Sequence, residues 1–185
     1  MTHLRDIAIA VFFVWIFADG FVVFRRRSGS AENRDRSSLQ VLMIGNMLAW
    51  LLAFWFAFAN PGTIRLPLQI AGLMVMASGI AIRSVAIAQL GRFHTPNVAV
   101  LADHEVCERG LYRHVRHPSY LGALIAFLGF GFALGNWFSL LILMLLTTAV
   151  YLYRIREEEA ALRAALGERY DDYCRRTKRL IPGLY

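Results

Sequence analysis

The chain has 185 residues, of which 57% are apolar and 18% are charged, and its formal net charge is +7 at pH 7. So much apolar sequence excludes an ordinary soluble domain, and the chain is too short for two membrane domains. A nucleic-acid-binding protein is also disfavoured, because the basic residues are confined to the gaps between apolar runs. We therefore expect one integral membrane domain over residues 1–185, with no nucleic-acid partner.

The first half of the chain holds three apolar runs, each long enough to cross a bilayer as a helix. They occupy residues 4–24, 39–59 and 66–90. In the first run the arginine cluster follows the apolar residues, which is the reverse of a cleavable signal peptide. In the third run, Gly72 and Gly79 would let a neighbouring helix approach closely. Arg83, near the end of that run, is expected to extend its charge toward lipid headgroups, with a buried ion pair as the alternative.

The second half begins with a polar loop over residues 91–117, which is too long to be a simple connector. Four of the five histidines lie in this loop. Pro118 is expected to begin the next helix, because its fixed φ suits a first helical turn. Two shorter apolar helices are then predicted over residues 118–134 and 138–153, and the second continues out of the membrane. A short helix and a basic tail end the chain.

The distribution of basic residues predicts the topology. Seventeen of the 20 Lys and Arg residues fall in the segments 25–38, 91–117 and 154–185. By the positive-inside rule these segments share the cytoplasmic side of the membrane, which gives five spans with the N-terminus outside. Cys107 and Cys174 would both face the cytoplasm, where thiols stay reduced, so no disulfide is expected.

Two groups of ionisable residues would meet at that side of the membrane. One is the histidine-bearing loop, and the other is the run from Glu157 to Glu159 with Arg154 just before it. The loop could simply anchor a helix end in headgroups. The glutamates could form a solvated helix face, with Arg154 opposite Glu158 and Glu159 opposite Arg163. The functional alternative is a cavity between the two groups, into which a carboxylate and a guanidinium point.

A metal centre is a competing use of the histidines. His104, Cys107 and His117 could in principle be ligands, but their spacing is not that of a typical zinc site. The sequence also lacks a glycine-rich dinucleotide loop and a nucleophile elbow. We therefore expect no metal.

The second half of the chain carries spaced blocks that resemble the isoprenylcysteine carboxyl methyltransferase family of integral membrane methyltransferases. The blocks are His104-Glu-Val-Cys107, Gly110, Tyr112, Arg116-His117-Pro118, Tyr120, Gly122, Arg154-Ile155, Glu158-Glu159, Leu162, Gly167, Tyr170, Tyr173 and Ile181-Pro182. The resemblance covers roughly residues 90–183. Cys107 departs from the family, which more often has His-x-Leu-Val there. The resemblance thus divides the domain into three N-terminal spans, 1–90, and a cofactor-binding catalytic half, 91–185.

The resemblance implies that S-adenosylmethionine is bound by the loop before the fourth span and by the helix after the fifth. The implied cofactor contacts are Asn97, His104, Glu105, Val106, Cys107, Tyr112, His117, Pro118, Ser119, Tyr120 and Glu159. Arg154 would bind the methyl acceptor, with Glu158 beside it as a second catalytic residue. Aromatic rings, backbone amides and a carboxylate suit a cationic sulfonium with an adenine and a ribose. A carboxylate acceptor is already ionised, so catalysis would be mostly alignment and desolvation.

Other functions remain open at this stage. The C-terminal part of the chain also resembles that of membrane sterol reductases, which would use NADPH. The shared features include Tyr173-Cys174 and Ile181-Pro182. The run from Glu157 to Glu159, and the Arg154-Ile155 pair that begins this motif, favour the methyltransferase. A phospholipid N-methyltransferase and a non-enzymatic membrane scaffold are further alternatives. For the methyltransferase we expect a lipid or isoprenoid small-molecule acceptor and a bacterial inner membrane, with the site facing the cytoplasm.

Overall fold

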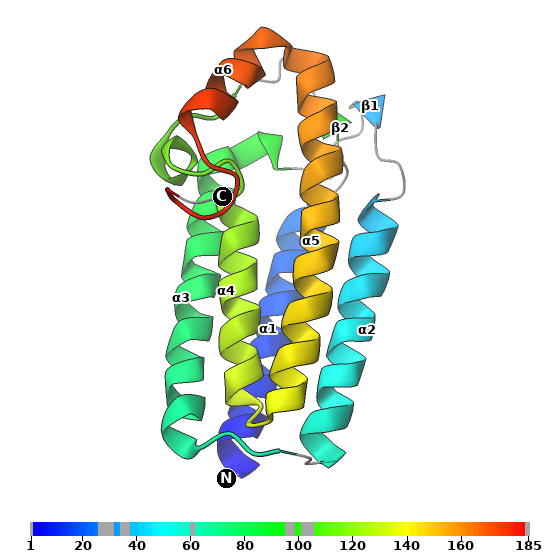
Figure 1. Ribbon diagram of the computed structural model, residues 1–185, viewed down its shortest axis with the longest axis vertical. Coiled ribbons are helices and arrows are strands. Elements are labelled where there is room, and N and C mark those ends of the chain that lie inside the picture. Colours follow the sequence, from blue (N-terminus) through cyan, green and yellow to red (C-terminus); the bar gives the residue numbers. More distant parts are fainter. Residues whose placement is uncertain are drawn as a thin grey trace.

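Five helices lie side by side along the long axis of the molecule (Figure 1). They are α1 (Thr2–Arg25), α2 (Ser38–Ala59), α3 (Leu66–Leu90), α4 (Pro118–Ala133) and α5 (Trp137–Leu166). A shorter helix, α6 (Glu168–Arg176), lies at the end opposite the N-terminus. The computed structural model describes residues 2–25, 32–33, 38–59, 62–94, 99–100 and 106–183. The predicted all-α bundle is confirmed.

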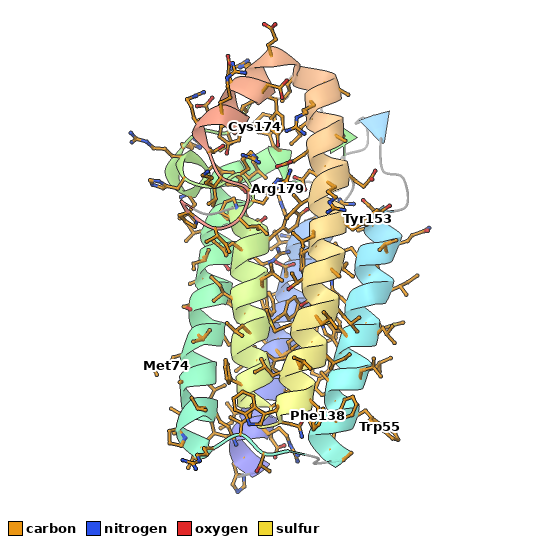
Figure 2. All side chains as sticks on the ribbon, viewed as in Figure 1. Trp55, Met74, Phe138, Tyr153, Cys174 and Arg179 are labelled. Atoms are coloured by element: carbon orange, nitrogen blue, oxygen red, sulfur yellow. The ribbon has the colours of Figure 1, made fainter. Side chains whose placement is uncertain are left out.

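The bundle has the surface of a membrane protein. Three helices, α2, α3 and α5, are long and apolar enough to cross a membrane, while α4 is apolar but 16 residues long. Trp55 is 70% exposed and Met74 is 65% exposed, and both point away from the helices in Figure 2. Large apolar side chains exposed in such numbers would be a liability in water, whereas lipid tails cover them without cost. The chain is a multi-pass integral membrane protein.

Helices α3 and α4 pack with their backbones in contact. A Cβ atom on Gly79 would lie 2.3 Å from the Ala126 nitrogen, and one on Gly72 would lie 2.7 Å from the Gly129 carbonyl oxygen. A Cβ atom on Gly122 or Gly129 would be equally close to the α3 backbone. The predicted role of Gly72 and Gly79 is confirmed, and their partners are two glycines that α4 places at the same seven-residue spacing.

We expect Gly79→Ala to lower the free energy of unfolding by about 2 kcal/mol, because the added methyl group must push two backbones apart. Gly20→Ala is a matched control, since a Cβ at Gly20 in α1 would meet no atom within 4 Å. That substitution should be neutral or stabilising by up to about 1 kcal/mol, because alanine is the better helix former. Thermal unfolding of the detergent-solubilised variants measures both. Equal stability of Gly79→Ala and the natural protein would contradict the close packing.

Aromatic rings attach α1 to the rest of the bundle. The Phe12 ring stacks on Phe130 of α4, with centroids 4.2 Å apart and planes 7° apart. Trp15 packs against Phe127 at 5.5 Å, and Phe12 also contacts Trp50 of α2 edge to face at 5.1 Å. These contacts form the centre of the buried apolar core. Aromatic pairs of this kind stabilise a core beyond their buried area alone.

The two ends of the bundle differ in character. At the end that carries the N-terminus, the Ile64 amide donates to the Gly135 carbonyl at 2.8 Å, which ties the α2–α3 and α4–α5 connections together. At the opposite end, two-residue strands β1 (Glu32–Asn33) and β2 (Ala99–Val100) pair antiparallel. The 3₁₀ helices η1 (Gly91–Phe93) and η2 (Gly110–Arg113) and helix α6 complete that end.

The three basic segments therefore meet at one end, as the charge distribution predicted. Residues 32–33 pair with residues 99–100, and the isolated bridge between Val115 and Lys178 joins the loop to the tail. This holds for the described parts of those segments, which exclude Arg26, Arg27, Arg34 and Arg36. The assignment of this end to the cytoplasm stays a prediction.

The expected position of Arg83 is wrong. Its guanidinium does not extend toward headgroups but forms two hydrogen bonds with the Asp19 carboxylate of α1, at 2.8 and 2.7 Å. The alternative, a buried ion pair, is the one that the fold adopts. Asp19, the partner of Arg83 in this ion pair, lies 64 positions earlier in the chain.

Candidate functional site

The site begins with the segment that enters α4, which the C-terminal tail holds in place. The Arg116 amide donates to the Lys178 carbonyl at 2.8 Å, and the His117 amide donates to the Arg179 carbonyl at 3.1 Å. The Tyr173 hydroxyl of α6 donates to the Tyr112 carbonyl at 2.7 Å. Pro118 begins α4, as its fixed φ predicted. The loop, the tail and α6 thus form one layer over the ends of α4 and α5.

Glu159 of α5 is the centre of a buried ion cluster under that layer. Its side chain is 2% exposed, and its Oε1 accepts from Arg116 Nε at 2.8 Å and contacts His117 Nε2 at 3.3 Å. Its Oε2 accepts from Arg179 at 2.7 and 3.1 Å. Arg116 also donates to the carbonyls of Cys174 and Thr177. This carboxylate therefore joins α5, the entry to α4 and the tail, and both of its oxygens are in use.

The partners of Glu159 differ from those of a solvated helix face, which the sequence left as one alternative. His117 and Glu159, which the resemblance implies as cofactor contacts, contact each other through their side chains. Glu159 does not pair with Arg163, whose guanidinium donates to Asp171 of α6 at 3.1 Å. Arg163 lies one turn after Glu159 on α5, as the helical spacing requires. The guanidiniums that reach Glu159 are instead those of Arg116 in the loop and Arg179 in the tail. Arg163, the partner expected from the spacing, binds the Asp171 carboxylate.

Glu158, one residue earlier, belongs to a second group of contacts. Its Oε2 accepts a hydrogen bond from the Tyr120 hydroxyl at 2.6 Å. The Arg154 guanidinium lies beside the same hydroxyl and donates to Ser38 Oγ at the start of α2. Arg154 is 3% exposed. The Tyr120 ring stacks on His117, with centroids 5.6 Å apart and planes 20° apart, so the two groups of contacts touch.

Two buried tyrosine hydroxyls lie near these groups: that of Tyr170 has no hydrogen-bond partner among the described residues, whereas that of Tyr112 lies near the Ser119 side chain. Tyr112 lies in η2 and is 5% exposed, and Tyr170 lies in α6 and is 2% exposed. Burial raises the pKa of both hydroxyls above the usual value, and the charge of Glu158 contributes to both shifts. Both hydroxyls are therefore neutral and can donate or accept a hydrogen bond. A buried hydroxyl without a partner is costly, so a polar ligand is the expected partner.

A cavity of about 380 Å³ opens beside η2, between the end of α3 and the loop. It is lined by Gln89, Leu90, Phe93, Val106, Cys107, Glu108 and Arg109. Gln89 shapes this cavity, since its Oε1 accepts from the Leu111 amide at 2.9 Å and its carbonyl accepts from Arg109. Gly110 adopts a φ of +59°, a left-handed conformation that glycine tolerates, with Gln89 packed where a Cβ would be.

The predicted site residues that the structure describes lie at the same end of the bundle, but not all in one group of contacts. Tyr112, His117, Tyr120, Arg154, Glu158 and Glu159 lie in the contacts above, Pro118 and Ser119 form the buried first turn of α4, and Val106 and Cys107 line the cavity. Asn97, His104 and Glu105 lie outside the described residues. Among the described residues no three His, Cys, Asp or Glu side chains gather in a way that could hold a metal ion.

Sequence reasoning missed Arg179, Tyr170 and Gln89 as parts of the site, and quoted Arg116 only as a motif residue. Tyr170 was available from the motif that holds Gly167 and Tyr173, but nothing in that spacing marks its hydroxyl as unpartnered. Arg179 looked like one member of a basic tail, and its link to Glu159 appears only in three dimensions. Gln89 lies at the end of an apolar span and carries no local signal.

The fold and the site define a class: a multi-pass helical membrane protein with a site of tyrosines, arginines and glutamates at one end of its bundle. A family model, that of the isoprenylcysteine carboxyl methyltransferase (ICMT) family, matches residues 71–164. The chain belongs to this family.

Similar proteins include several that carry the name of that family. A protein-S-isoprenylcysteine O-methyltransferase of Schizosaccharomyces pombe is 35% identical over 116 residues, which are 62% of this chain and 49% of that protein. A probable protein-S-isoprenylcysteine O-methyltransferase of Oryza sativa subsp. indica is 27% identical over 183 residues, covering 91% of this chain and 95% of that protein. The chain thus spans about half the length of the first relative and nearly all of the second.

A solved structure shares the fold. It is the structure of the eukaryotic intramembrane Ras methyltransferase, isoprenylcysteine carboxyl methyltransferase, without a monobody. The TM-score is 0.61 at 27% sequence identity, and the match covers 77% of this chain and 52% of that one. The matching region is therefore most of this chain but only about half of the solved protein.

Proposed function

We propose that this protein is an S-adenosylmethionine-dependent methyltransferase that methylates a carboxylate on a membrane-embedded isoprenoid or lipid acceptor. The observation that carries the proposal is the convergence, in a chain of this family, of Arg154, Glu158 and Tyr120 with the buried hydroxyls of Tyr112 and Tyr170 at one end of the bundle. The names of the relatives support the reaction type.

The residues present suit the cofactor. The hydroxyls of Tyr112 and Tyr170 are buried donors or acceptors, and that of Tyr170 has no partner among the described residues, so both suit a polar ligand. Val106 and Cys107 line a cavity of about 380 Å³ beside Tyr112, a size typical of small-ligand sites. S-adenosylmethionine would supply a methyl group on a cationic sulfonium, and a nearby carboxylate and aromatic rings favour such a cation.

Glu158 is the better candidate for the carboxylate that contacts the cofactor, in place of Glu159. Both oxygens of Glu159 already accept from Arg116, His117 and Arg179. Glu158 accepts from Tyr120 through Oε2, and its charge acts on the hydroxyls of both Tyr112 and Tyr170. We therefore assign Glu159 to holding the layer of loop and tail in position, and Glu158 to the cofactor.

Arg154 is the proposed clamp for the acceptor. It follows the apolar part of α5, so it lies at the depth where a lipid's polar head would meet the site. Its planar guanidinium can hold a carboxylate through two parallel hydrogen bonds, which orients one oxygen for attack. Because that oxygen is already ionised, no side chain has to remove a proton, and the residues act by alignment and by excluding water.

The orientation follows from charge. The end that carries the site holds the described arginines of the loop, α6 and the tail, and the positive-inside rule assigns that end to the cytoplasm. The bacterial inner membrane stays a prediction, since the relatives named above are eukaryotic.

Binding of S-adenosylhomocysteine to the detergent-purified protein tests the proposal. Calorimetry should show one site, and NADPH should neither bind nor compete. Labelled methyl transfer to a prenylated cysteine, to another isoprenoid acid and to a phospholipid amine then distinguishes the acceptors, with the two carboxylates expected to react. Binding of NADPH in place of S-adenosylhomocysteine would replace the methyltransferase with the reductase. Binding of neither would return the chain to a membrane scaffold.

A further inference from the structure

An ion pair between α1 and α3, which the proposed function does not use, lies inside the bundle. Arg83 Nε donates to Asp19 Oδ1 at 2.8 Å, and Arg83 Nη2 donates to Asp19 Oδ2 at 2.7 Å. The two side chains are 10% and 19% exposed. Ionisable residues within membrane spans are costly, so they usually serve a function beyond joining two helices. Aromatic and small-residue contacts already attach α1 and α3 to α4.

The third contact of Arg83 indicates what that function is. Its Nη1 donates to the carbonyl oxygen of Ser119 at 3.3 Å, in the first turn of α4. The next residue, Tyr120, carries the hydroxyl that donates to Glu158. Close to this point a Cβ on Gly122 would lie 2.5 Å from the Arg83 nitrogen, so the two backbones are in contact. Arg83 therefore connects α1 to the part of α4 that enters the site.

The ion pair between Asp19 and Arg83 can fix the orientation of the Arg83 guanidinium. A guanidinium has five N–H donors in a rigid plane, so two parallel bonds to Asp19 also fix where its remaining amino group points. A lysine in the same place would keep the charge but not that geometry. Asp19 in turn neutralises the buried guanidinium, which would otherwise be an unpaired charge inside the bundle.

We propose that Asp19 and Arg83 are positioning residues of the site. Asp19 orients Arg83, and Arg83 holds the first turn of α4 so that Tyr120 reaches Glu158. This inference rests on the proposed function, because it concerns the wall of the same cofactor site. It gives the first helix, α1, a part in a site whose motif residues all lie after residue 90.

The experiment measures S-adenosylhomocysteine affinity and thermal stability side by side on detergent-purified variants. Asp19→Asn and Arg83→Lys should each weaken the affinity about fivefold or more, since a displaced Tyr120 and Glu158 would lose hydrogen bonds to the ligand. Arg5→Lys is the matched control. Arg5 also lies on a helix of the bundle, α1, and donates to a backbone carbonyl, that of Ala57, but at the opposite end of the bundle. Its affinity should equal that of the natural protein.

The exchanged pair, Asp19→Arg with Arg83→Asp, separates positioning from simple attachment. It restores opposite charges between α1 and α3 but presents an acceptor to the Ser119 carbonyl. We expect stability to recover toward the natural protein while affinity stays low. Recovery of both would overturn the inference, as would affinities of Asp19→Asn and Arg83→Lys within twofold of the natural protein.

A double-mutant cycle decides the question if the exchanged pair does not fold. Because Arg83 is proposed to act through Tyr120, the affinity loss of Arg83→Lys should shrink in a Tyr120→Phe background. Fully additive losses would contradict the inference. If the natural protein itself fails to bind S-adenosylhomocysteine, the proposed function falls and this inference falls with it. If the natural protein and every variant bind S-adenosylhomocysteine normally, the positioning role of Asp19 and Arg83 is wrong and the proposed function stands.

Discussion

Replacing Arg154 by alanine is expected to lower methyl transfer to a carboxylate acceptor about a hundredfold or more, because an acceptor misplaced by about 1 Å can lose that much rate. Affinity for S-adenosylhomocysteine should change little, since the cofactor contacts lie on Glu158 and the tyrosines. Arg154→Lys keeps the positive charge but loses the planar fork, so it should recover only part of the rate. Rates and affinities measured on the same preparations make the comparison.

Arg156, two residues further along α5, provides the control for this prediction. It lies on the same helix but is exposed, so Arg156→Ala should keep both rate and affinity. A loss of cofactor affinity equal to the loss of rate in Arg154→Ala would move Arg154 into the cofactor site. Unchanged rate and affinity would leave it with a structural role, through its bond to Ser38.

The neighbouring glutamates should respond in opposite ways to the same substitution. Glu159→Gln removes the charge that Arg116, His117 and Arg179 share, and breaking a buried ion cluster costs about 3–5 kcal/mol of stability. Glu158→Gln can still accept from Tyr120, so its stability should fall by less than about 1 kcal/mol. Its affinity for S-adenosylhomocysteine should instead fall about tenfold or more, because a charged hydrogen-bond partner is lost.

Thermal unfolding and calorimetry on the two variants give a two-by-two comparison. Each glutamate is the control for the other, because the two residues are adjacent on α5 and the substitution is identical. If Glu159→Gln keeps its stability but loses cofactor affinity, the assignment of the two residues is reversed and the sequence expectation for Glu159 returns. If Glu158→Gln binds S-adenosylhomocysteine normally, Glu158 has no part in the cofactor site.

The amino-acid sequence by itself determined the class of protein and the layout of the chain. Runs of about 20 apolar residues, the stop of the third span near Leu90 and the start of α4 at Pro118 are local signals, so they can be read without a fold. The glycines at positions 72 and 79 predicted a close helix pair for the same reason. The spaced blocks after residue 90 were enough to indicate the family.

Only the tertiary structure decided how the charged residues are used. Adjacent residues on a helix point about 100° apart, so Glu158 and Glu159 face different neighbours, and no spacing rule says which neighbours those are. The partners of Glu159 lie 20 to 43 positions away, and Asp19 lies 64 positions from Arg83. Each of these pairs forms because a buried charge needs a partner and the folded bundle brings one within reach. The choice among the available partners is a property of the packing.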